Sequence, residues 1–239
     1  MIASNESLFF LHAVVGGVAL LAAARLGRLY VVGAIVTCTI LMNIAVQKQM
    51  SLFGMTVTGG NVLFGLVFLG VDILNEHYGK RVARNAVFVG FAANIFVVLM
   101  MQFVLHYAPA DGDPAQEPMM FFFNATAYPR IVCASMASYL LSQLLDVQIY
   151  QALHNRTGEK KLWLRTNAST WLAQAFDTTF FTFAGLWGTV ITTWPEFRDA
   201  VLFAYIIKIA VALLDTPFLY LTKTAPMRPR QKPTVQGSN

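Results

Sequence analysis

One pattern occurs twice in this chain: Ala137-Ser138-Tyr139-Leu140-Leu141-Ser142-Gln143-Leu144-Leu145-Asp146, and again Ala168-Ser169-Thr170-Trp171-Leu172-Ala173-Gln174-Ala175-Phe176-Asp177. Residues three apart share a face of a helix, so each copy would present a carboxamide beside a carboxylate on an otherwise apolar surface. Both copies lie in stretches long enough to cross a bilayer. A carboxylate near the centre of such a helix costs about 2.5 to 3.5 kcal/mol to insert, so it needs a partner, water or a ligand. The repeated Gln/Asp pairs therefore predict a polar pocket inside a membrane.

The composition is that of a polytopic membrane protein. Of the 239 residues, 56% are hydrophobic and only 12% are charged, whereas about 25% are charged in soluble domains. No polar interval is long enough for a separate soluble domain. We therefore expect one all-α transmembrane domain over residues 1–223. A cytoplasmic disordered tail is expected over residues 224–239, which are rich in Pro, Arg, Gln and Ser.

Seven apolar runs approach the length of about 20 residues that spans a bilayer. They are 8–25, 29–47, 58–75, 86–107, 125–153, 168–190 and 199–222. The leading stretch 1–7 contains Glu6 but no Lys or Arg, which argues against a signal peptide. The first two runs are separated only by the corner Arg25 to Arg28, so they form either a tight helical hairpin or one helix with a weaker leader. A bundle of six to seven transmembrane helices is expected.

Loop charges predict the orientation, because Lys and Arg accumulate on the cytoplasmic side. Alternate loops hold Arg25 and Arg28; Lys80, Arg81 and Arg84; Arg156, Lys160, Lys161 and Arg165; and Lys223, Arg228, Arg230 and Lys232. The opposite loops hold Lys48, Arg198 and the acidic stretch Asp111, Asp113 and Glu117. The C-terminus is therefore expected in the cytoplasm.

Few ionisable residues lie within the predicted spans, namely Asp72, Glu76, Asp146, Asp177, Lys208 and Asp215. A purely structural interpretation is that Lys208 neutralises Asp177 or Asp146 and that amides such as Gln143 and Gln174 join helices, at about 0.6 kcal/mol for each hydrogen bond. One lysine cannot neutralise several carboxylates. The others must be protonated, hydrated or available to a donor-rich ligand, which favours a solute path.

Other function classes lack their motifs. The chain has no P-loop, and Glu76-His77 lacks the second histidine of a zinc protease. No nucleophile triad, cofactor motif or metal cluster is evident, so we expect no catalytic residue, no cofactor and no metal. The basic residues form no continuous patch, which argues against a nucleic-acid partner. Cys38 and Cys133 are expected to be buried thiols.

Several motifs carry a family resemblance between Asn43 and Tyr220. They are Asp72-x-x-x-Glu76-x-Tyr78-Gly79-Lys80-x-x-Ala83-Arg84, Ser142-Gln143-x-x-Asp146, Trp163-x-Arg165-x-Asn167-x-Ser169-Thr170, Gln174-x-x-Asp177-Thr178, and Lys208 with Asp215-Thr216-Pro217-Phe218-x-Tyr220. In this order they resemble the queuosine precursor transporter family, also called the vitamin uptake transporter family. The resemblance implies a multi-pass protein of the bacterial inner membrane that imports 7-deazaguanines such as preQ0, preQ1 or queuine for tRNA modification.

The resemblance, together with the polar pattern, suggests a substrate site. Its residues would be Asn43, Asp72, Glu76, Gln143, Asp146, Asn167, Trp171, Gln174, Asp177 and Lys208. In this hypothesis Asp177 or Asp146 accepts from the donor edge of the purine-like ligand, and Gln143 and Gln174 complete the hydrogen bonding. Asn43 and Asn167 would close the ends, and Lys208 would keep the carboxylates ionised. The aromatic side chains expected to stack on the ring are Trp171, Phe176, Tyr139 and Phe180.

Alternatives remain open on the sequence alone. The chain could be the substrate-binding membrane subunit of an importer energised by a separate ATPase module, although no such module is expected. A membrane enzyme or scaffold is the weaker class. The sequence does not decide which deazaguanine is preferred, whether a proton gradient drives transport, or whether the lipid-embedded chain forms a homodimer.

Overall fold

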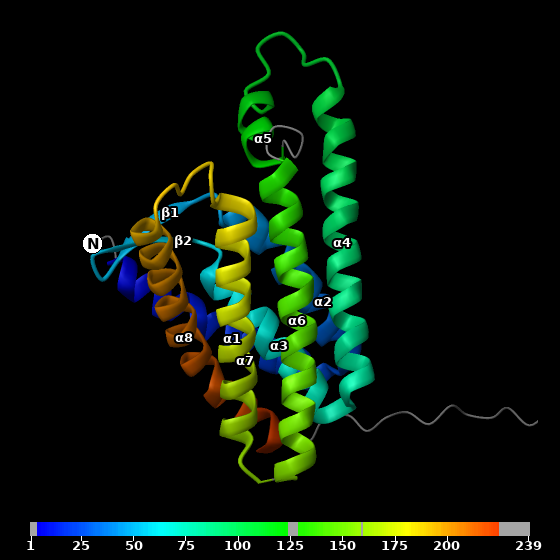
Figure 1. Ribbon diagram of the computed structural model, residues 1–239. Coiled ribbons are helices and arrows are strands. Elements are labelled where there is room, and N and C mark those ends of the chain that lie inside the picture. Colours follow the sequence, from blue (N-terminus) through cyan, green and yellow to red (C-terminus); the bar gives the residue numbers. More distant parts are fainter. Residues whose placement is uncertain (1–3, 124–128, 159, 225–239) are drawn as a thin grey trace, which may run out of the picture.

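The structure of this chain is a computed structural model, which describes residues 4–123, 129–158 and 160–224 (Figure 1). Within these residues almost all of the chain is helical, as the apolar runs predict. The elements are α1 (Asn5–Leu26), α2 (Arg28–Ala45), β1 (Gln49–Leu52), β2 (Met55–Thr58), α3 (Asn61–Tyr78), α4 (Lys80–His106), α5 (Gln116–Phe123), α6 (Pro129–Thr157), α7 (Leu162–Phe181), the π-helix η1 (Thr182–Leu186) and α8 (Trp194–Thr224).

The long helices have the length and composition of membrane spans. Seven described α-helices contain 18 or more residues, and five of these, α1, α2, α4, α6 and α8, are apolar enough to cross a membrane on their own. Their outer faces carry exposed side chains such as Phe96, Phe103 and Leu29. Lipid, unlike water, does not penalise such exposure. The chain is an all-α polytopic membrane protein.

Helix α3 is the central helix of the bundle. It packs against α1, α2, α4, α6 and α8, and Figure 1 shows it in the middle of the molecule. Nearly every residue from Val62 to Asn75 is buried, including the ionisable Asp72. Asp72 therefore lies inside the bundle, where polar neighbours and not lipid must satisfy it.

Helices α1 and α2 form the tight hairpin that was one of the two predicted arrangements. They meet at Gly27, which has φ 125° and no heavy atom within 4 Å of the position that a Cβ would occupy. A residue with a side chain rarely adopts this backbone conformation. The corner between Arg25 and Arg28 is therefore a helix break enforced by glycine.

Two elements outside the bundle were not predicted. Residues 49–58 form an antiparallel hairpin, β1 with β2, in which Leu52 pairs with Met55. The turn residues Phe53 and Gly54 both have positive φ, 51° and 76°, which is typical of the tight turns that join two strands. Helix α3 consequently begins at Asn61 and not at residue 58. The second element is the short helix α5, near the acidic loop.

The start of α7 corrects the sequence analysis. The predicted span began at residue 168, with Arg165 in a basic loop before it, but α7 already begins at Leu162. Arg165 is fully buried and forms an ion pair with Glu76. A buried carboxylate on α3 supplies the partner that allows an arginine to leave the surface. At its other end the α-helix stops at Phe181, and η1 follows.

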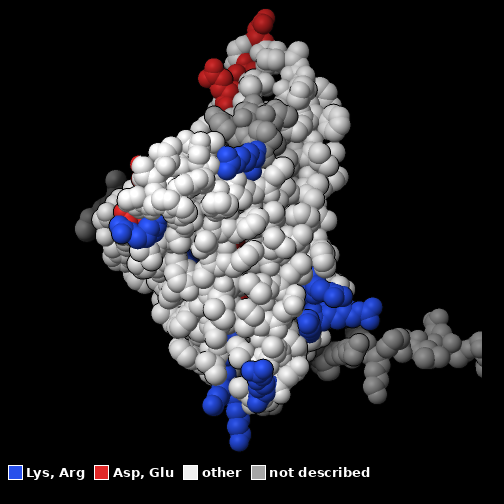
Figure 2. All heavy atoms as spheres, viewed as in Figure 1, with Lys and Arg blue, Asp and Glu red and all other residues white. Residues whose placement is uncertain are grey.

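Charged side chains gather at the two ends of the bundle. In Figure 2, Lys and Arg cluster mainly at the lower end of the view and Asp and Glu mainly at the upper end. Figure 1 places the α6–α7 connection and the start of α4 at the lower end, and the α4–α5 loop at the upper end. The alternation of loop charge along the sequence thus corresponds to two separated faces. The predicted tail begins at Thr224, but Thr224 is the last residue of α8. The rest of the predicted tail, 225–239, lies outside the described residues.

Candidate functional site

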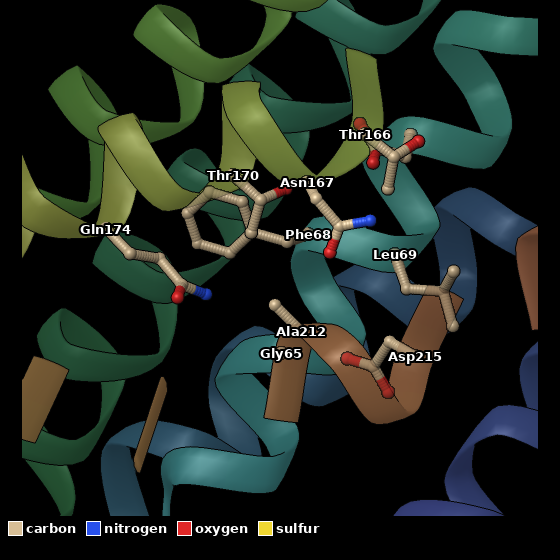
Figure 3. Close-up of a pocket in the computed structure, with 10 residues that line it drawn as sticks. Gly65, Phe68, Leu69, Thr166, Asn167, Thr170, Gln174, Ala212 and Asp215 are labelled. Atoms are coloured by element: carbon tan, nitrogen blue, oxygen red, sulfur yellow. The ribbon is translucent and has the colours of Figure 1, made fainter. Parts of the chain in front are cut away.

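A polar pocket lies between α3, α7 and α8 (Figure 3). Helices α3 and α8 supply an apolar floor and two carboxylates, and one face of α7 supplies hydroxyl and amide groups. The lining residues are Gly65, Phe68, Leu69 and Asp72 of α3, Thr166, Asn167, Thr170 and Gln174 of α7, and Ala212 and Asp215 of α8. The polar residues of α7 recur every three or four positions, which is the spacing of one helix face.

Gly65 allows α8 to approach α3 closely. A Cβ at this position would lie 2.3 Å from Cγ1 of Val211 and 2.8 Å from Oδ2 of Asp215. Both distances are shorter than real Cβ contacts, so another residue fits only if the side chains of Val211 and Asp215 shift. The absence of a side chain at Gly65 therefore brings the Asp215 carboxylate against the backbone of α3, at the edge of the pocket.

Several polar groups of the pocket have no hydrogen-bond partner. They include both carboxylate oxygens of Asp215, both amide atoms of Gln174 and Oδ1 of Asp72. In Figure 3, Gln174 and Asp215 lie on opposite sides of the group of lining residues. A buried polar group without a partner costs about 1 to 3 kcal/mol. The space between them is only about 10 Å³, room for no more than one water molecule, so a polar ligand can reach these acceptors and donors only when the helices move apart.

Asn167 and Thr170 differ from these groups because they are already engaged. The Asn167 amide donates to Oγ1 of Thr216 at 3.0 Å and to the carbonyl of Trp163 at 3.0 Å. Thr170 donates to Oδ1 of Asp146 at 3.3 Å. Asn167 therefore joins α7 to α8, and Thr170 joins the pocket to α6.

Helix α6 lies behind the pocket and carries the first Gln/Asp pair. Gln143 and Asp146 are both fully buried. Both amide atoms of Gln143 and Oδ2 of Asp146 lack a hydrogen-bond partner. The Asp146 carboxyl interacts with that of Asp72 across the α3–α6 contact. The second polar pair thus extends the unpartnered region from the pocket into the bundle.

An ion pair borders the pocket on one side. Lys208 Nζ lies 2.6 Å from Oδ2 of Asp177 and 3.1 Å from Oγ1 of Thr178. The hydroxyl of Ser138 donates to Oδ1 of Asp177 at 2.6 Å, and the ammonium lies 4.4 Å from the ring centroid of Phe64. These contacts connect α3, α6, α7 and α8.

A second ionic cluster borders the pocket on the other side and joins the same four helices. Arg165 donates to both oxygens of Glu76. Tyr150 donates to Oε2 of Glu76 at 2.6 Å, and Lys223 Nζ lies 2.6 Å from Oε1. Along α3 and α7 the pocket residues fall between the two clusters. The pocket therefore lies between two ionic layers.

The predicted site residues divide into groups in the structure. Asp72, Asn167 and Gln174 line the pocket, Gln143 and Asp146 lie behind it, and the ionic layers contain Glu76, Asp177 and Lys208. Lys208 pairs with Asp177 alone in the described residues, so it does not keep several carboxylates ionised.

Two predicted residues and the predicted stacking aromatics lie elsewhere. Asn43 donates to the carbonyl of Thr39 within α2, and Trp171 packs edge to face against Trp163, with ring centroids 5.8 Å apart. Tyr139 hydrogen bonds with Thr39, and Phe176 stacks on Phe180. None of them is among the described lining residues of the pocket. The ring that does line it is Phe68.

The sequence analysis did not include Asp215, Thr166, Thr170, Gly65 or Phe68 in its site. A signal for Asp215 existed, because it follows Lys208 by seven residues and so lies on the same face of α8. The roles of Gly65 and Phe68 depend on contacts between helices and have no comparable signal in the sequence.

A bundle of membrane-length helices that encloses an unpartnered polar pocket defines a membrane protein that handles a polar solute. The sequence model of the family described as "putative vitamin uptake transporter" matches residues 58–222. The chain belongs to this family of transporters, and the resemblance inferred from the motifs is confirmed.

Curated relatives agree with this assignment. The chain is 37% identical over 186 residues to a probable queuosine precursor transporter of Bacillus subtilis, an alignment that covers 77% of this chain and 80% of the relative. It is 25% identical over 173 residues to a queuosine precursor transporter of Escherichia coli, in an alignment that covers 72% of this chain and 75% of the relative. A probable queuosine precursor transporter of Haemophilus influenzae is 28% identical over 129 residues, in an alignment that covers 53% of this chain and 51% of that relative. No solved structure matches the chain.

Proposed function

We propose that this chain is a multi-pass transporter of the bacterial inner membrane that imports queuosine precursors. The names of its relatives support this substrate class, and its family is one of transporters. The observation that carries the proposal is the pocket itself. Asp215, Gln174 and Asp72 bring unpartnered acceptors and donors together from three helices, at positions enclosed by the bundle.

The chemistry of the pocket suits a 7-deazaguanine. Such a base presents a ring N–H and an exocyclic amine side by side, and these two donors match the two oxygens of one carboxylate. Asp215 has both oxygens unpartnered and supplies this acceptor. Gln174, on the opposite side of the pocket, can accept from the pyrrole N–H of the base through its amide oxygen, and Phe68 offers an apolar ring face. Asn167 is fixed by Thr216 and Trp163 and positions this wall of the pocket.

The two ionic layers suit the two closures that a transporter needs. The layer of Asp177 and Lys208 lies on one side of the pocket, and that of Glu76, Arg165 and Lys223 on the other. Since each joins α3, α6, α7 and α8, separating these helices on one side would open the pocket while the other layer keeps it closed. Gln143, unpartnered behind the pocket, would gain partners when the pocket widens.

The orientation follows from the charged ends of the bundle. In this proposal α1 to α4 and α6 to α8 are seven membrane spans, and the distribution of Lys and Arg supports a cytoplasmic location for the basic end. The C-terminus is then cytoplasmic and the N-terminus is outside. The membrane domain of this proposal extends to Thr224, one residue beyond the predicted boundary at 223.

Uptake into liposomes tests the proposed function. The purified chain, reconstituted alone, is expected to exchange internal unlabelled preQ1 for external labelled preQ1, whereas empty liposomes do not. Asp199→Asn, which alters an exposed carboxylate, serves as a control for insertion and handling. Tight binding of preQ1 without any exchange would instead indicate a subunit that needs a separate ATPase module. Absence of both binding and exchange would contradict the proposal.

A further inference from the structure

The polar interior of the bundle contains more carboxyl groups than cations can neutralise. Five carboxyl groups lie in the region of α3, α6, α7 and α8, namely Asp72, Glu76, Asp146, Asp177 and Asp215. Arg165 and Lys223 pair with Glu76, and Lys208 pairs with Asp177. Among the described residues no ion pair reaches the other three. Asp72, Asp146 and Asp215 are therefore buried acids without a cation.

Asp215 has a different environment from the other two. Its oxygens lie at the edge of the pocket, where the N–H groups of a ligand can become its partners. Asp72 and Asp146 instead interact with each other across the contact between α3 and α6, and their exposed fractions are 1% and 0%. Two adjacent buried carboxylates that no cation of the described residues reaches cannot both be ionised. This carboxyl pair therefore holds at least one proton when the bundle is closed.

The groups around the carboxyl pair offer no positive charge. From α7 the neighbours are hydroxyl groups, of which Thr170 donates to Asp146. From α6 Tyr150 lies near Asp72, but its hydroxyl donates to Glu76. Glu76, one turn after Asp72 on α3, is engaged by Arg165, and Asp215 approaches from α8 as a further acid. A proton is the only positive charge that this part of the structure provides for the pair.

The carboxyl pair also borders the proposed substrate site, because Asp72 lines the pocket. We propose that Asp72 and Asp146 carry the proton that couples import to the proton gradient. This inference depends on the proposed function. The pair binds one proton while the pocket is open to the outside and releases it when the pocket opens to the cytoplasm. The empty bundle closes with one proton on the pair and the loaded bundle closes with two, because substrate displaces water from the pocket that Asp72 lines. Each substrate molecule therefore enters with one net proton.

The test uses liposomes with a pH-sensitive dye inside and with the membrane potential short-circuited. The wild-type chain is expected to move about one proton with each molecule of preQ1. An inward proton gradient of about one pH unit would then support about tenfold accumulation, since one unit corresponds to 1.36 kcal/mol. Asp146→Asn, which does not line the pocket, is expected to lose gradient-driven accumulation and proton movement but to continue exchanging labelled for unlabelled preQ1. Asp72→Asn is expected to lose both gradient-dependent signals.

Each alternative result decides between the two proposals. Wild-type protein that exchanges preQ1 but moves no proton would overturn the coupling and leave the transport function standing. Wild-type protein with no exchange would overturn both. Gradient-driven accumulation by Asp146→Asn at the wild-type level would also overturn the coupling. If the variants fail to insert, the number of protons that wild-type protein takes up when it binds preQ1 in detergent is measured instead. Uptake of about one proton is expected, and no uptake would refute the role of the pair.

Discussion

Lys208 Nζ lies 2.6 Å from Oδ2 of Asp177 inside the bundle, and in the described residues neither charge takes part in another ion pair. Ser138 satisfies the remaining oxygen of the carboxylate. The pair joins α7 to α8, and through Ser138 and Phe64 it also reaches α6 and α3. Breaking one half of such a pair leaves a largely buried charge without its counter-charge.

The first prediction concerns this ion pair. Lys208→Met should destabilise the protein by about 3 to 5 kcal/mol, because Asp177 is left buried without its cation. The double variant Lys208→Met with Asp177→Leu should recover part of that loss, since no uncompensated charge remains. Thermal unfolding in detergent measures both. A double variant that is as unstable as the sum of the two single variants would contradict this account.

The second prediction compares a buried with an exposed ion pair. Arg165→Met removes one of the two cations that pair with Glu76 and should cost about 1.5 to 3 kcal/mol of stability, the contribution of a hydrogen bond to a charged group. Arg198→Met removes a surface pair with Asp199 and should cost less than about 1 kcal/mol. The midpoints of unfolding of the two variants are compared under the same conditions. Equal losses would mean that the Glu76 cluster does not hold the helices together.

The third prediction uses two glycines. Gly65→Ala places a Cβ 2.8 Å from Oδ2 of Asp215 and 2.3 Å from Cγ1 of Val211, so the Asp215 carboxylate must shift and preQ1 binding should fall strongly. Gly33→Ala is the matched control, because no heavy atom lies within 4 Å of its Cβ position on the exposed face of α2. It should leave binding unchanged and could stabilise the helix by about 0.5 to 1 kcal/mol. Equal binding by the two variants would refute the close approach at Gly65.

The fourth prediction tests Asp215 as the acceptor of the ligand's donors. Asp215→Asn replaces one oxygen by an NH2 group, so one donor of the base is left unpaired. The cost of about 1 to 3 kcal/mol corresponds to roughly a 5-fold to 150-fold loss of affinity. An analogue of preQ1 without the exocyclic amine should bind wild-type protein weakly but should show little further loss with the variant. If the variant weakens both ligands equally, Asp215 acts on the structure of the pocket and not on this amine.

The sequence alone predicted much of this architecture. Hydrophobic length gave the long helices, and the alternation of Lys and Arg gave the two charged ends that Figure 2 shows. The spacing of Gln143 with Asp146, and of Gln174 with Asp177, placed polar groups in the interior. These signals are periodic or summed along the sequence, so they can be recognised without knowing which helices pack against each other.

The remaining features depend on which helices meet. Asp177 and Asp146 belong to the same sequence pattern, yet one faces Lys208 and the other faces Asp72. Arg165 looks like a residue of a basic loop until Glu76, 89 positions away, is known to lie against it. Periodicity gives the face of a helix on which a residue lies, but it does not give the partner on the facing helix. The pocket therefore became visible only from the packed structure.

The polarity of α3 and α7 has a consequence for how the protein is made. These two long helices are not among the five that are apolar enough to cross a membrane on their own, yet α3 lies at the centre of the bundle. During biosynthesis, each must therefore be retained in the membrane by its neighbours, α2 and α4 for α3 and α6 and α8 for α7. The polar residues that line the pocket lower the hydropathy of α3 and α7. The same residues therefore make the newly synthesised α3 and α7 depend on neighbouring helices, some inserted before them and some after.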